Sequence, residues 1–228
     1  MTHIIPRMTR LGFLVAIAFV TFASPASADR ERDAQKLVDA AYHAYQDLTE
    51  GSASDTKNTL LKEARAVMIF PRVSKGGFIF GAEGGNGVLL AKQEDGSWSY
   101  PAFYGMGSLS FGLQAGYQNT RILLIIMNDS ALTSILEGKL KLGADASIVI
   151  IDEGVDGEFS TNTARQDMYY YAQTEAGLFA GISIEGSDIF TKDKYNHAYY
   201  GGSPSPADIV IRTTVQNAEA DRLRAKLP

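Results

Sequence analysis

Residues 108–118 alternate apolar residues with polar residues or glycine, without a break. The apolar positions of SLSFGLQAGYQ are Leu109, Phe111, Leu113, Ala115 and Tyr117. Because successive side chains of a strand point to opposite faces, the pattern predicts a β-strand with one buried face. A phosphate-binding glycine loop would instead need a helix directly after the glycines. The strand pattern therefore argues against a nucleotide site, and the glycines are expected to permit turns or close strand approach.

The first 28 residues have the layout of a secretory signal peptide. Arg7 and Arg10 precede the apolar run 11–22, and Ala26 and Ala28 occupy the small-residue positions of a cleavage site. A membrane anchor is the alternative, but a span needs about 20 apolar residues. We therefore expect cleavage after Ala28 and a location in the periplasm or outside the cell.

Charge and cysteine content exclude several classes of function. The chain has 21 Lys and Arg against 26 Asp and Glu, a net charge of −5, which becomes more negative when Arg7 and Arg10 leave with the signal. This balance argues against nucleic acid as a partner. The sequence contains no cysteine, which excludes disulfides, thiolate chemistry and a lipid-modified N-terminal cysteine.

Two helices are expected before the strands begin. In residues 29–50, Val38, Ala41, Tyr45 and Leu48 form one stripe of a 3.6-residue period, and glycine follows the segment. A second helix is expected at 55–66, with an N-cap at Ser54 or Asp55.

The remaining chain reads mostly as strands. Proline ends the first of them, a glycine-rich turn separates the second and third, and Asp95-Gly96 marks a hairpin turn. The expected strands are 67–71, 76–85, 87–92, 108–118, 121–128 (buried on both faces), 147–152 and two within 167–189, the second with Leu178, Ala180, Ile182 and Ile184 inward. Asp129 or Ser130 would cap a short helix at 129–138, and a polar helix at 207–226 would pack Ile209, Ile211 and Val215.

Strands outnumber helices, and the long helices lie at the ends of the chain. This order predicts an α+β fold: one domain with a mostly antiparallel β core and flanking N- and C-terminal helices. We divide the chain into a signal peptide (1–28), an N-terminal helix (29–54) and the folded domain (55–228).

No catalytic residue, metal site or cofactor is predicted. His43 and His197 are too few for a His and Cys metal site, and the acidic stretch 152–158 does not have calcium-loop spacing. No G-x-S-x-G elbow occurs. The tyrosines at 169–171, 195, 199 and 200 are expected to pack in the core rather than to form a binding surface.

One segment is basic within this acidic chain. Residues 56–76 carry a single acid, Glu63, and five cations, which are Lys57, Lys62, Arg65, Arg72 and Lys75. Such a cluster predicts contact with anionic lipid headgroups. A solvated helix face is the alternative interpretation.

Several motifs occur in the order of a known family. KGGF (75–78), GNGV (85–88), DGSWSYP (95–101) and GLFAGISIEG (177–186) resemble the SYLF domain family over roughly residues 55–212. The resemblance implies a lipid-binding module that is not an enzyme, with phosphoinositide binding in eukaryotic members and actin binding in some. Lys75 stands at the family's K-x-G-F position.

An exported bacterial member would not meet actin or phosphoinositides. We therefore expect anionic phospholipid or a membrane surface as the partner, with phosphatidylglycerol, cardiolipin or lipopolysaccharide as candidates. The segment 29–50 stands where eukaryotic members carry an amphipathic membrane helix, but its acidic start (Asp29, Glu31 and Asp33) argues against insertion.

Two alternatives to lipid binding stay open. A protein–protein interaction module of the envelope would expose an apolar or tyrosine-rich patch, and a hydrolase would have a deep pocket with carboxylates or His197 at shifted pKa.

Overall fold

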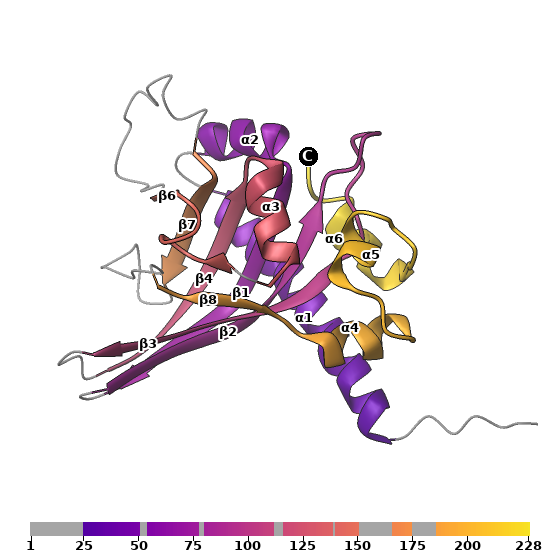
Figure 1. Cartoon of the computed structure of the whole chain (residues 1–228), viewed down its shortest axis with the longest axis horizontal. Coiled ribbons are helices and arrows are strands. Elements are labelled where there is room, and N and C mark those ends of the chain that lie inside the picture. Colours follow the sequence, from indigo (N-terminus) through magenta and orange to yellow (C-terminus); the bar gives the residue numbers. More distant parts are fainter. Residues whose placement is uncertain are drawn as a thin grey trace, which may run out of the picture.

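A computed structural model shows one curved sheet with helices on both faces (Figure 1). It describes residues 25–50, 54–77, 80–111, 116–138, 140–150, 166–174 and 186–228. The helices are α1 (Pro25–Thr49), α2 (Ser54–Glu63), α3 (Asp129–Leu136), α4 (Asp193–Tyr200), α5 (Pro206–Val210) and α6 (Asp221–Arg224), with a 3₁₀ turn at Ala218–Ala220.

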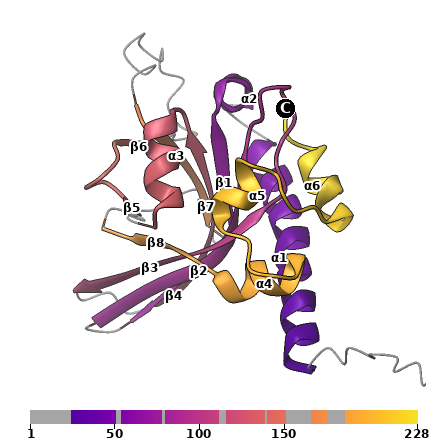
Figure 2. The same cartoon turned by 45° about the vertical axis from the view of Figure 1, so that its right-hand side comes forward.

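The strands in sequence order are β1 (Ala66–Gly77), β2 (Phe80–Ala91), β3 (Ala102–Phe111), β4 (Gly116–Ile126), β5 (Leu140–Lys141), β6 (Ile148–Ile150), β7 (Met168–Thr174) and β8 (Asp188–Thr191). They form one sheet in the order β5-β8-β3-β2-β1-β4-β7-β6. The β6–β7 pair is parallel and the other neighbours are antiparallel. The predicted α+β, mostly antiparallel single domain is confirmed. The ends of β1 to β4 project from the body as an arm (Figures 1 and 2).

The sheet has a core on each face. Helices α3 and α5 pack on one face, here called the inner face. Helices α1, α2, α4 and α6 pack on the other, the outer face. The residues of β4 from Ile122 to Ile126 are fully buried and alternate between the two cores. The prediction that this segment is buried on both faces is therefore confirmed.

Helix α1 buries the predicted stripe against the outer face. Val38, Ala41, Tyr45 and Leu48 are all buried there. The helix begins at Pro25, ahead of the cleavage position predicted after Ala28. The apolar run of the predicted signal lies outside the described residues.

The predicted end of the first strand at Pro71 is wrong, because β1 continues to Gly77. The pairing with β2 shifts between Ile69 and Arg72, and the pairing with β4 shifts between Phe70 and Val73. Pro71 has no N–H to donate and falls in this β-bulge, where no ladder partner is needed.

The predicted glycine turn between residues 85 and 87 is also wrong, since β2 is continuous from Phe80 to Ala91. A Cβ on Gly85 would lie 2.4 Å from the carbonyl oxygen of Arg72, and one on Gly87 would lie 2.5 Å from that of Ile69. These glycines therefore let β2 approach the bulge of β1 closely.

The alternating segment 108–118 is not one strand. Its first part ends β3 at Phe111 and its last part begins β4 at Gly116, two strands that β2 and β1 separate in the sheet. Residues 112–115 lie outside the described residues. Tyr117, predicted to face inward, is 70% exposed. Period two continues on both sides of a chain reversal, so the pattern alone cannot locate the reversal.

Helix α3 is where the sequence placed it, but its cap is Asn128 rather than Asp129 or Ser130. The Asn128 side chain accepts a hydrogen bond from the backbone N–H of Ala131, and Gly138 follows the helix with a left-handed φ of 67°.

The single C-terminal helix predicted at 207–226 is wrong. Short helices replace it, and a left-handed φ of 48° at Thr213 separates α5 from the later turns. Ile209 is buried as predicted, whereas Ile211 is 42% exposed. Helix α4 was not predicted. The expected inward positions from Leu178 to Ile184 lie outside the described residues.

Candidate functional site

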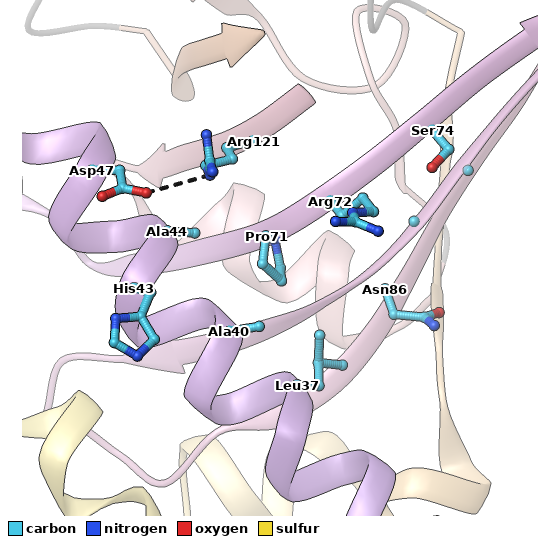
Figure 3. Close-up of a pocket in the computed structure, with 12 residues that line it drawn as sticks. Leu37, Ala40, His43, Ala44, Asp47, Pro71, Arg72, Ser74, Asn86 and Arg121 are labelled. Carbon is cyan, nitrogen blue, oxygen red and sulfur yellow. Dashed lines mark ion pairs between the residues drawn. The ribbon is translucent and has the colours of Figure 1, made fainter. Parts of the chain in front are cut away.

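A groove of about 540 Å³ lies between α1 and the outer face of the sheet (Figure 3). Strands β1, β2 and β4 form one wall, with Arg72, Asn86 and Arg121 among its residues. One side of α1 forms the other wall, where Ala40 and Ala44 leave space between the helix and the strands.

The bulge at Pro71 brings Arg72 to this groove. Ile69 packs in the outer core, Phe70 in the inner core, and Val73 again in the inner core. In a regular strand, residue 72 would share the inner face with Phe70. The extra residue in the bulge turns Arg72 to the outer face instead, where it is exposed and pairs across the ladder with Asn86.

The groove carries more positive than negative charge. Arg121 Nε lies 3.5 Å from Asp47 Oδ2, so the carboxylate from α1 has a cationic partner within the groove. Arg72 adds a second guanidinium, and His43 lines the helix side. Nothing in the sequence indicated Arg121 or His43, because the sheet and α1 bring them to Arg72 from distant positions.

The five predicted cations do not form one patch. Lys57 is fully buried, which contradicts its role as a headgroup contact. Its Nζ donates to the backbone carbonyl of Leu48 at 2.9 Å and lies 4.0 Å from the centroid of the Tyr171 ring. A helix of 10 residues presents one face to the core, and Lys57 lies on that face beneath the last turn of α1.

The other four cations are dispersed. Lys62 is exposed on α2. Arg65 is held by Asp129, with Nε 2.5 Å from Oδ1, and its Nη1 donates to the backbone oxygen of Lys92 at 2.6 Å. Lys75 lies two residues after Val73 and therefore shares the inner face with it, on the other side of the sheet from Arg72. Only Arg72 of the five lines the groove.

Lys75 instead lies beside an acid that the sequence did not single out. It pairs across the β1–β2 ladder with Glu83, which is 7% exposed. Burial raises the pKa of Glu83, and the positive charge of Lys75 lowers it in opposition. Burial also raises the pKa of Tyr170, with the nearby Glu83 charge adding to the effect. The positive charge of Lys75 therefore interacts with the buried Glu83 on the inner face, away from the groove.

A second pocket of about 430 Å³ lies beside α4 and contains His197, Lys194 and Ser203. His197 Nδ1 is 3.5 Å from Ser203 Oγ, at the limit of a hydrogen bond. Within the described part of the chain, no group of three His, Cys, Asp or Glu residues could hold a metal ion. None of the described helices combines the length and apolar character that crossing a membrane requires.

The predicted tyrosines all pack in or against the two cores, with Tyr195 and Tyr200 only partly buried. Tyr169, Tyr170, Tyr171 and Tyr199 are buried, and Tyr199 meets Phe103 edge to face with ring centroids 5.1 Å apart. Their role is therefore structural.

A family model described as Ysc84, Las17-binding protein actin regulator, matches residues 107–228. The chain belongs to the Ysc84 family. This result confirms the resemblance to SYLF domains that the motifs indicated.

Eukaryotic proteins are among the relatives of this Ysc84-family chain. The SH3 domain-containing YSC84-like protein 1 of Rattus norvegicus is 30% identical over 154 residues, covering 66% of this chain and 45% of the relative. Protein YSC84 of Saccharomyces cerevisiae is 31% identical over 145 residues, covering 62% and 31% respectively. An SH3 domain-containing protein of Schizosaccharomyces pombe is 29% identical over 179 residues, covering 77% and 41%. The chain thus spans less than half the length of each of these relatives.

Proposed function

We propose that this Ysc84-family domain binds anionic phospholipid headgroups at a membrane surface, as a binding module and not as an enzyme. We further propose that it acts in the periplasm or outside the cell after removal of residues 1–28. The observation that carries the binding proposal is the placement of Arg72 by the Pro71 bulge in a groove that also contains Arg121 and His43.

The chemistry of the groove suits a phosphate group. A guanidinium presents a planar fork of N–H donors that matches phosphate oxygens. The single carboxylate in the groove, Asp47, is already paired with Arg121. An incoming anion would therefore meet a net positive site within a chain of net charge −5. Each cation near an anionic surface contributes about 1 kcal/mol, and salt screens the attraction within about 8–10 Å.

The direct test is flotation of the exported chain with vesicles of phosphatidylglycerol and phosphatidylcholine, or of phosphatidylcholine alone, at low and high salt. We expect flotation with the anionic vesicles, and weaker flotation as salt rises. Arg72→Gln should weaken binding about fivefold, the equivalent of about 1 kcal/mol.

Lys62→Gln is the matched control for the loss of one charge. Lys62 is exposed and belongs to the same basic segment, but it lies outside the groove. Equal losses in the two variants would contradict the groove and favour a diffuse basic segment. Binding that does not change with salt or lipid charge would contradict the electrostatic mechanism.

The proposed removal of residues 1–28 has its own test. Mass spectrometry of the exported chain should show Asp29 as its first residue, and an intact N-terminus would refute the proposed cleavage.

The second candidate function is a protein–protein interaction module of the envelope. Two large side chains, Tyr117 and Phe190, are well exposed, and the family description names Las17 and actin regulation. Failure of the chain to float with any vesicle, together with an unchanged fold, would favour this function over lipid binding.

A further inference from the structure

We infer that the outer face of the sheet, from the groove across to β8, is the surface that lies on the bilayer, with Tyr117 and Phe190 as its interfacial anchors. This inference rests on the proposed lipid function and adds the orientation of the domain and two contact residues. Arg72, Arg121 and Lys192 complete this surface, which we call the docking face.

The two rings are unusually exposed for their size. Tyr117 is 70% exposed and Phe190 is 45% exposed, and with Ile211 they are the exposed large hydrophobic side chains among the described residues. Tyrosine and phenylalanine in such positions suit a membrane interface, where an apolar ring enters the boundary between headgroups and chains.

Strand register places both rings on the face that holds the groove. Phe190 of β8 pairs with Gly105 of β3, which pairs with Asn86 of β2, which in turn pairs with Arg72 of β1. A Cβ on Gly105 would lie 2.4 Å from the Phe190 ring, so the ring lies directly over that glycine. These four residues form one row across the sheet. Phe190 lies at its β8 end, and Arg72 in the groove lies at its β1 end.

Tyr117 stands on the other side of the groove. It lies on β4 opposite Gly76, and its hydroxyl is 3.3 Å from the hydroxyl of Ser74, which lines the groove. Gly84 and Gly107 occupy the sheet between Tyr117 and Phe190 and have no side chains. In the row between the two rings, β2 and β3 therefore carry no side chain on this face.

The charges on this face complement an anionic bilayer. Lys192 Nζ lies 5.9 Å from the centroid of the Phe190 ring, which places a cation beside that anchor. Arg72 provides a second cation, in the groove. Two acids on this face have cationic partners: Asp188 Oδ1 lies 3.9 Å from Lys141 Nζ, and Asp47 Oδ2 lies 3.5 Å from Arg121 Nε. Apolar rings flanked by cations bind anionic bilayers better than neutral ones, because the two contributions add.

The absence of cysteine from the chain allows a direct test with single-site labels. Tyr117→Cys, Phe190→Cys and Ile211→Cys are each labelled with the environment-sensitive fluorophore NBD and mixed with vesicles of phosphatidylglycerol and phosphatidylcholine. Ile211 is the matched control, because it is an exposed large apolar residue that follows α5, and α5 packs on the inner face. We expect a blue shift, and quenching by nitroxide-labelled lipid, at positions 117 and 190 but not at 211.

Flotation of unlabelled variants gives a second measurement. Tyr117→Ser should weaken binding about tenfold through the loss of a ring from the interface, whereas Ile211→Ser should leave it unchanged. Because the Phe190 ring covers Gly105, thermal unfolding of each variant is measured alongside, and position 117 alone suffices if Phe190→Cys is unstable. Vesicle binding with quenching at 211, or at no labelled position, would overturn the docking face while leaving the lipid function intact. Lack of vesicle binding by the unsubstituted chain would instead overturn the proposed function.

Discussion

Replacing Lys57 by methionine removes a buried positive charge and keeps most of the side chain's volume. In the folded protein the ammonium donates to the carbonyl of Leu48 at 2.9 Å, at the C-terminal end of α1, and lies 4.0 Å from the Tyr171 ring centroid. The lysine thus ties α2, α1 and β7 together at a point where no water reaches it.

The size of the effect follows from these contacts. A hydrogen bond to a charged group contributes about 1.5–3 kcal/mol, and a cation over an aromatic ring contributes about 0.5–2 kcal/mol. The recovered cost of burying the ammonium offsets part of this loss. We expect Lys57→Met to lower the free energy of unfolding by about 1–3 kcal/mol, a drop in Tm of about 2–12 °C for a domain of this size.

Thermal and urea unfolding, followed by circular dichroism, measure the change. Lys62→Met on the same helix is the control, and its exposed side chain should alter stability by less than about 0.5 kcal/mol. A Lys57→Met protein that unfolds at the wild-type temperature or above would refute the reasoning, because the contacts would then not exceed the cost of burial. Reduced vesicle binding with unchanged stability would restore Lys57 to the lipid surface.

Two further predictions concern backbone packing and pH. Gly85→Ala should cost about 1–3 kcal/mol in urea unfolding, because its Cβ would lie 2.4 Å from a carbonyl oxygen of β1, whereas Gly84→Ala, with its nearest neighbour at 3.4 Å, should be close to neutral; equal stabilities would contradict the bulge geometry. Hydrogen bonds from Ser205 lower the pKa of Asp208 from 3.8 to about 2, so the stability they contribute is present above pH 3.8 and is lost as the pH falls toward 2. The Tm gap between wild type and Asp208→Asn should therefore narrow across that interval, and a gap that stays constant would show that the carboxyl is not shifted.

The sequence predicted the elements whose burial follows one period over many residues. The stripe of α1 from Val38 to Leu48 and the two-sided burial of β4 were both confirmed. It failed where one residue type has two structural uses. Pro71 was taken as a strand end and lies in a bulge, and the glycine-rich stretch between 85 and 87 was taken as a turn and lies in a continuous strand.

The candidate site was less predictable than the fold. Arg72 was selected for its charge, and it lines the groove, but the same criterion selected the fully buried Lys57 and the inner-face Lys75. Arg121 and His43 were missed, because each is an isolated residue in an apolar or helical context and joins Arg72 only in the folded chain.

By itself, the sequence determined the family, the α+β class and which faces of α1 and β4 are buried, because local periodicity and ordered motifs carry that information along the chain. Only the tertiary structure decided which cations reach solvent and which side of the sheet each one occupies. The physical reason is that a charge pattern gives only the order of cations along the chain, whereas the exposure of each side chain depends on residues that are distant in sequence and close in the fold. The last turn of α1 and the Tyr171 ring cover Lys57, while one bulge in β1 turns Arg72 outward.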